Sequence, residues 1–172
     1  RGLAKTIIGK KIVGVDFDVQ KSFQGKKEDI VGSEIVEIDR RAKLVQIKLS
    51  NRKNLLFHLK LTGQLIVIDH DERFAGGHPS HDWHAKLPNS NTRITFGLGD
   101  GVKLYFNDMR KFGWCKVLDD DEVAAIYKKD YGLEPLDAGF TVDYLLDKAK
   151  RIPNRNIKQF LMDQTIAAGM GN

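Results

Sequence analysis

The chain has 172 residues, of which 41% are hydrophobic and 30% are charged, and its formal net charge at pH 7 is +5. This is the length and composition of one ordinary globular domain, or of one domain with part of a second. No apolar run approaches the roughly 20 residues that a membrane-spanning helix needs. The single cysteine, Cys115, excludes an internal disulfide and fits a reducing compartment. We therefore expect a cytoplasmic protein.

The positive charge is concentrated in the first part of the chain. Residues 1–60 contain 14 Lys and Arg against 7 Asp and Glu, whereas residues 61–172 contain 14 against 16. A basic segment of this kind predicts a polyanionic partner, most often nucleic acid. A globular domain that is basic without such a partner is the alternative at this point.

The elements expected along the chain begin with the end of a helix, since Ile7 and Ile8 are followed by Gly9. From Lys11 to Leu118 the pattern is that of β-strands, because short runs rich in β-branched and aromatic residues alternate with Gly, Asn and Asp. The runs are KIVGVDFDV, SEIVEID, LVQIKL, NLLFHL, GQLIVID, TRITFGL, VKLYF and GWCKVL. Since no helical pattern separates them, the sequence predicts an antiparallel sandwich or barrel.

One long segment in this region, Asp69 to Ser90, shows no periodicity and is expected to be a surface loop. It contains His78, His81 and His84, whose spacing of three is also seen in metal sites. No cysteine accompanies them, and Pro79 argues against a rigid helix. A polar loop is therefore favoured over a metal site.

Helical patterns follow. The first covers residues 120–129, DDEVAAIYKK, which have an acidic first turn and a basic last turn. The second covers residues 141–150 and begins at a Thr suited to an N-cap. The third covers residues 156–169, which carry an apolar stripe that ends at Gly169. The sequence thus predicts an α+β protein. An antiparallel β-sandwich with a truncated first helix is expected over residues 1–118, and a truncated helical domain over residues 119–172.

Two features of the strand region point to a site. The connection between the strands VKLYF and GWCKVL places Arg110 and Lys111 beside Met109 and Phe112, which suits neither a core nor an ordinary surface. At the start of LVQIKL, Lys43 lies on the face that the apolar residues of this strand share. A lysine at the end of an apolar row either extends to solvent or serves a site.

Five stretches, DRRAKLVQIKL, HLKLTGQL, YFNDMRKFG, GLEPL and IKQFLMDQTIAAGMGN, occur in the order found in bacterial formamidopyrimidine-DNA glycosylases. The chain resembles this family, which also includes endonuclease VIII, over essentially its whole length. The resemblance implies a β-sandwich, a helical domain with a helix–two-turn–helix motif, and a zinc finger. It places a Pro-Glu segment with the nucleophilic proline before Arg1, and the second helix of the motif and a four-cysteine finger after Asn172. No cofactor is expected within these residues, and one zinc ion is expected in the finger of the parent protein.

The resemblance also implies roles for particular residues. An enzyme that works on one base of a duplex rotates the nucleotide out of the stack, and side chains then fill the void. Leu61, Arg110 and Phe112 are expected to form this void-filling wedge, with Leu61 standing where the family usually has Met. Lys43 is the expected catalytic residue, acting by proton transfer during β-elimination at the abasic sugar.

Contacts with DNA are the second set of roles that the resemblance implies. The expected contacts are made by His58, Asn91, Arg110, Arg155, Lys158 and Asn172. Asn91 and Arg93 depart from the two histidines that many family members have here, and the amide of Asn91 could still donate to a phosphate.

The predicted function is that of a bifunctional DNA glycosylase and AP lyase of base excision repair. Its expected partner is double-stranded DNA that contains abasic sites or oxidised purines, such as 8-oxoguanine and formamidopyrimidines, and it is expected to act as a monomer. The chain by itself is expected to be inactive. Three alternatives remain: an endonuclease VIII-type enzyme for oxidised pyrimidines, a non-catalytic homologue that binds damaged DNA, and a basic β protein that binds RNA.

Overall fold

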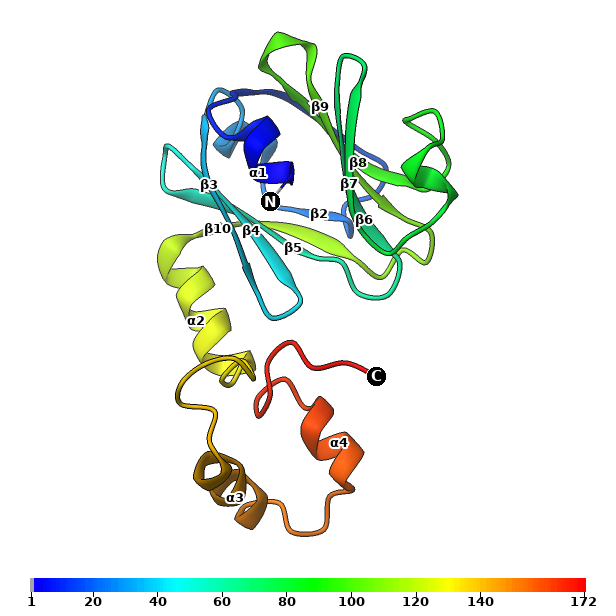
Figure 1. Cartoon of the computed structure of the whole chain (residues 1–172). Helices are drawn as coiled ribbons and strands as arrows, with labels where there is room; N and C mark the ends of the chain where they lie inside the picture. Colours follow the sequence, from blue (N-terminus) through cyan, green and yellow to red (C-terminus); the bar gives the residue numbers. More distant parts are fainter. Residues whose placement is uncertain (1) are drawn as a thin grey trace. The chain divides into compact units, whose positions relative to one another are not determined.

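The structure is a computed structural model that describes residues 2–172, and it has α+β architecture. The described chain forms two compact units, coloured along the sequence in Figure 1. The first unit contains the residues up to Asp39 together with Leu44–Asp120, and the second contains Arg40–Lys43 and Asp121–Asn172. The α-helix α1, Gly2–Ile7, opens the first unit, and Gly9 follows it at a φ of +85°, as the sequence predicted.

The first unit contains two five-stranded sheets. One has the order β1-β8-β9-β6-β7, formed by Ile12–Phe17, Thr92–Leu98, Lys103–Asp108, Gly63–Asp69 and Glu72–Gly77. The other has the order β2-β10-β5-β4-β3, formed by Phe23–Gln24, Trp114–Asp119, Lys53–His58, Leu44–Leu49 and Ile35–Arg41. Short 3-10 turns lie at Lys27–Asp29, His81–Trp83 and Gly99–Gly101. The first sheet is antiparallel throughout, and the parallel pairing of β2 with β10 makes the second sheet mixed.

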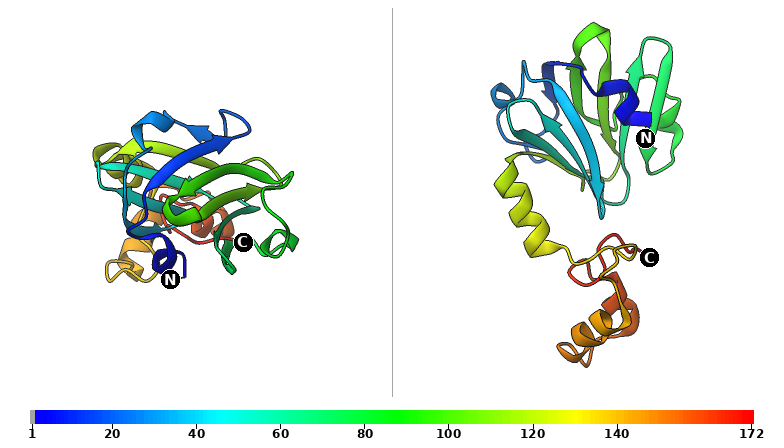
Figure 2. Two further views of the ribbon diagram at one scale, coloured as in Figure 1. Left: turned by 90° about the horizontal axis from the view of Figure 1, so that it is seen from above. Right: turned by 60° about the vertical axis from the view of Figure 1, so that its left-hand side comes forward.

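The two sheets pack face to face and share one core, as the views in Figures 1 and 2 show. Its centre is aromatic: the ring of Phe57 on β5 lies edge-on to Phe96 on β8 and Phe106 on β9, with centroids 5.9 and 5.7 Å apart. All three rings are fully buried. This packing confirms the predicted β-sandwich and fixes β5 and β9 against each other near the ends where their connections begin.

The prediction of an unbroken loop from Asp69 to Ser90 was wrong, because Glu72–Gly77 forms β7 and pairs antiparallel with β6. Strand β7 lies at the edge of its sheet and is only half buried, so its sequence lacks the alternation of a strand with one covered face. Arg73 on β7 also holds the segment that follows, since its Nη1 donates to the carbonyls of Trp83, at 3.1 Å, and Ala85, at 2.8 Å.

The second unit contains α2, Asp120–Asp130, whose first residue belongs to the first unit, followed by α3, Val142–Lys150, and α4, Ile157–Met162. The Thr141 hydroxyl caps α3 by accepting from the Tyr144 N–H at 3.2 Å, as predicted. The prediction that the last helix continues to Gly169 was wrong. Asp163 ends it, because its carboxylate accepts from the N–H and the hydroxyl of Thr165 in a local turn that competes with the helix.

No helix among residues 2–172 is both long and apolar enough to cross a membrane.

Candidate nucleic-acid interface

The connection between β9 and β10 exposes the mixed set of side chains that the sequence singled out. Met109 is 62% exposed and Phe112 is 50% exposed, although both are large and apolar. The Arg110 guanidinium lies 5.1 Å from the centre of the Phe112 ring, a cation–π contact that pairs the two side chains. Lys111 between them has a φ of +58°. The chain thus makes a tight turn that directs cationic and apolar groups outward.

The turn closes at Gly113, where no larger residue fits. A Cβ atom there would lie 2.6 Å from Cζ of the buried Phe106 and 3.1 Å from the carbonyl oxygen of His58. Only glycine allows the backbone to come so close to β5 and β9. The exposed turn therefore ends directly next to the aromatic centre of the core.

Leu61 lies in the connection between β5 and β6 and is 62% exposed. Lys60 before it has a φ of +53°, and the Gly63 N–H after it donates to the Leu59 carbonyl at 2.8 Å, so this connection is also a tight turn. Gly63 is the cross-strand partner of Asp108 at the end of β9. The three predicted wedge residues, Leu61, Arg110 and Phe112, are therefore brought together at one end of the first unit.

His58 is the last residue of β5 and lies next to this end. Its Nδ1 accepts from the Lys60 N–H at 3.0 Å, so the neutral ring carries its proton on Nε2. The Trp114 ring lies 5.6 Å away, and the Lys116 ammonium lies 4.8 Å from the Trp114 ring centre. This tautomer gives His58 a donor, which suits the phosphate contact that was predicted for it.

Asn91 and Arg93, where the sequence departs from the family pattern, both have partners inside the first unit. The Asn91 amide donates to the buried Asp82 carboxylate at 3.0 Å, and this carboxylate also accepts from the amides of Asn89 and Asn107. Arg93 is 4% exposed and forms an ion pair with Asp18. The structure therefore places Arg93 in the scaffold, and a phosphate contact by Asn91 would compete with its bond to Asp82.

In the second unit, Lys43 lies exposed in the turn that precedes β4. The turn is held by Glu134, whose carboxylate accepts from the N–H of Ala42, a residue with a φ of +53°. A Cβ atom at Gly171 would lie 3.2 Å from Lys43 Nζ, so this glycine lets the ammonium approach the backbone next to Asn172. The predicted catalytic lysine therefore lies beside Gly171, the residue that precedes Asn172.

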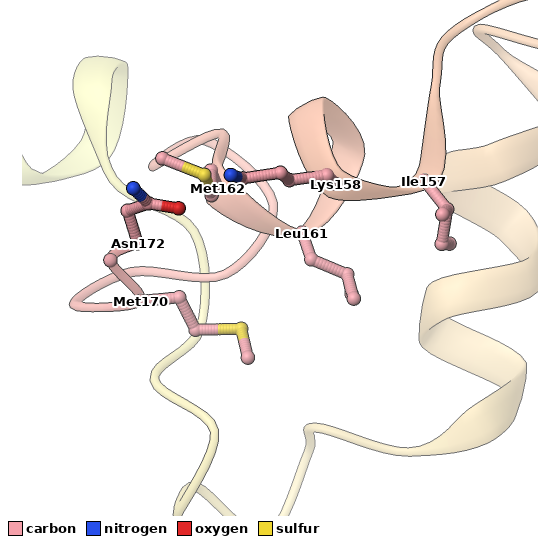
Figure 3. A pocket seen from close by; sticks show the side chains of 7 residues that line it. Ile157, Lys158, Leu161, Met162, Met170 and Asn172 are labelled. Carbon is pink, nitrogen blue, oxygen red and sulfur yellow. The ribbon is translucent and has the colours of Figure 1, made fainter.

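Lys158 and Asn172 line one groove of the second unit, with a volume of about 330 Å³. Figure 3 shows their polar ends directed toward one another. The rest of the lining is largely apolar and consists of Ile157, Leu161, Met162, Met170 and Gly171. The groove combines one ammonium and one amide with flexible apolar walls.

Arg155, also predicted to bind DNA, forms an ion pair with Asp163. Burial alone would raise the pKa of Asp163, but hydrogen bonds from Thr165 and the Arg155 guanidinium outweigh it and lower that pKa below its usual value. A phosphate contact by Arg155 would therefore be shared with Asp163 or would replace it.

The zinc ion that the resemblance implies does not fit the residues present. The sequence has one cysteine, and Cys115 is fully buried in the core of the first unit, where burial raises the pKa of its thiol well above the usual value. A four-cysteine site cannot form from these residues.

These features define an α+β protein in which exposed cationic and apolar side chains lie together at one end of a β-sandwich. Residues 1–115 match the family model for the formamidopyrimidine-DNA glycosylase N-terminal domain. The chain therefore belongs to the formamidopyrimidine-DNA glycosylase family.

Individual relatives agree with this assignment. A formamidopyrimidine-DNA glycosylase from Pelotomaculum thermopropionicum is 34% identical over 178 residues, which cover 100% of this chain and 59% of the relative. A similar protein from Carboxydothermus hydrogenoformans is 33% identical and is covered to 58%. The crystal structure of the Lactococcus lactis enzyme, bound non-covalently to DNA with an AP site, matches with a TM-score of 0.83 at 26% identity and covers 100% of this chain and 62% of that one. The chain thus spans about three fifths of the length of these relatives.

Proposed function

We propose that this chain is the DNA-engaging part of a base-excision-repair glycosylase with AP-lyase activity. The observation that carries the proposal is the exposed cluster of Leu61, Arg110 and Phe112 at one end of the sandwich. Exposed apolar side chains that gather beside a cation are typical of a surface that binds a partner, and a DNA duplex opened at one base offers both an apolar gap and unpaired acceptors. Support comes from the similar structures, which hold DNA with an AP site or with carbocyclic 8-oxoguanine.

In the proposed mechanism, the damaged nucleotide leaves the stack and the wedge replaces it. Phe112 stacks against the neighbouring base pair, Leu61 fills the remaining space, and the guanidinium of Arg110 donates to the unpaired base opposite. Unstacking a nucleotide costs a few kcal/mol, which these contacts offset. His58, through its Nε2–H, and Lys158 would hold phosphates of the damaged strand.

Lys43 is proposed to be the catalytic residue among those present. It would transfer a proton during β-elimination at the abasic sugar. Its exposed ammonium lies beside Gly171, in the backbone that leads to Asn172. The nucleophile that the resemblance implies is a proline amine outside these 172 residues. The chain alone is therefore proposed to bind damaged duplex without releasing the base.

The test uses an extended protein in which the Pro-Glu segment of the family precedes Arg1 and the helix and finger of the family follow Asn172. Borohydride is added during reaction with duplexes that contain 8-oxoguanine, an oxidised pyrimidine or no lesion. A covalent adduct with the 8-oxoguanine duplex is expected, with less on the oxidised pyrimidine and none on intact DNA. Preference for the pyrimidine would indicate an endonuclease VIII-type enzyme, and no adduct with any duplex would refute the glycosylase proposal.

A further inference from the structure

One buried carboxylate joins the two connections that carry the wedge. Asp108, the last residue of β9, is 1% exposed and lies between the turn at Leu61 and the turn at Arg110 and Phe112. A buried carboxylate is stable only where donors surround it. The donors here come from both connections.

The two oxygens of Asp108 serve different parts of the structure. Oδ1 accepts from the Thr62 hydroxyl, on the β5–β6 connection, and from the Arg110 N–H at 3.2 Å. Oδ2 accepts from the Gly113 N–H at 2.6 Å. The exposed turn is thereby bonded to the same carboxylate at both of its ends.

Thr62 is the link between the two turns. Its hydroxyl donates to the Asp108 carboxylate and accepts from the Arg110 N–H at 3.2 Å. One hydroxyl on the β5–β6 connection thus makes two hydrogen bonds to the end of β9 and the turn that follows it. Thr62 directly follows Leu61 and is itself buried. Any movement of Leu61 relative to Arg110 would break these bonds.

The opposite side of Asp108 is held by the buried Arg93. Its Nε donates to the Asp108 carbonyl at 3.0 Å, and its Nη1 pairs with Asp18. The Asp108 backbone is therefore fixed to the sheet independently of its carboxylate. Loss of the Thr62 hydroxyl would remove its bonds to Asp108 and Arg110, and so loosen the connection at Leu61 relative to Arg110, while β9 stays in place.

We propose that Thr62 and Asp108 form a positioning clamp that sets the separation of Leu61 from Arg110 and Phe112 before DNA binds. The inference rests on the proposed function of the wedge. Half-exposed side chains gain little order from the core, so the backbone bonds must hold them outward. A wedge already in its bound geometry has less conformational entropy to lose when it enters the stack. Thr62 and Asp108 act through the wedge and need not touch DNA.

The first test is the substitution Thr62→Val in the extended protein, which removes the hydroxyl while keeping the shape of the side chain. Thr62→Ser is the matched control, because it keeps the hydroxyl. We expect Thr62→Val to reduce the rate of 8-oxoguanine excision roughly tenfold, the upper range for one hydrogen bond. Cleavage at a preformed abasic site should fall less than threefold, since no base has to be displaced there. Thr62→Ser should restore excision to within about threefold of the unsubstituted protein.

The second test separates positioning from a general loss of structure. In a Phe112→Ala background the wedge is already impaired, so adding Thr62→Val should change excision by less than about twofold. Equal losses on both substrates, or a full tenfold further loss in the Phe112→Ala background, would overturn the clamp. If the unsubstituted extended protein acts on neither substrate, the proposed function fails instead, so the two failures are distinguishable.

Discussion

Substitution of Gly113 by alanine should destabilise the first unit, because this glycine closes the exposed turn against the core. The added methyl would lie 2.6 Å from Cζ of Phe106, which is fully buried and packs edge-on to Phe57, and 3.1 Å from Oδ2 of Asp108. Because Phe106 is fully buried, either its ring or the backbone at Gly113 must shift within the packed core. Overpacking of this kind costs about 1–3 kcal/mol, which corresponds to a fall in melting temperature of roughly 4–15 °C for a unit of this size.

The assay is thermal unfolding of the 172-residue chain, followed by circular dichroism. Gly14→Ala is the control, since Gly14 lies in strand β1 of the first unit and, unlike at Gly113, no atom comes within 4 Å of the added methyl. We expect Gly14→Ala to melt within about 2 °C of the unsubstituted chain, consistent with the small effect of an unstrained glycine replacement. Equal melting temperatures for the two variants would refute the close approach at Gly113.

Three further predictions concern charge and the thiol. The folded pKa of Asp163 is lowered from 3.8, so the stability that Arg155 and Thr165 provide is complete above pH 3.8 and is lost as the pH falls through the lower folded pKa. Melting temperatures measured between pH 2 and 6 should show this loss, and the variant Asp163→Asn should lack it. A pH profile that Asp163→Asn leaves unchanged would contradict the assignment. Cys115 should react with a thiol reagent at pH 8 only after denaturant is added, and rapid labelling of the native chain would show that it is not buried. Lys158→Gln should weaken binding to duplex DNA and reduce the slope of log K against log salt by about one, whereas an unchanged slope would exclude a phosphate contact.

Much of the first unit could be predicted because its strands follow local rules. The run LVQIKL, for example, is recognised from neighbouring residues alone, and it forms β4. Strand β7 could not be recognised, since it lies at an edge and gains its bonds from β6 rather than from its own pattern. The parallel pairing of β2 with β10 was also missed, because β2 has only two residues and so shows no strand pattern of its own.

The candidate site shows a similar division. The exposed cations and apolar groups at Arg110 and Phe112 were visible in the sequence because their chemistry conflicts with an ordinary core or surface. The residues that hold them gave no such signal. Asp108, Thr62 and Arg93 act through bonds between side chains and backbone groups far apart in the chain, and no periodicity reports such bonds. The end of α4 was missed likewise, because the turn at Asp163 depends on one carboxylate.

The measurement that tests the central claim most directly is the rate at which the extended protein excises 8-oxoguanine from duplex DNA when Arg110→Ala and Phe112→Ala are combined. We expect a loss of at least about a hundredfold, because the unpaired base and the open stack both lose their partners, with a melting temperature within a few degrees of the unsubstituted protein. An unchanged excision rate would contradict the proposal that these side chains take the place of the displaced nucleotide.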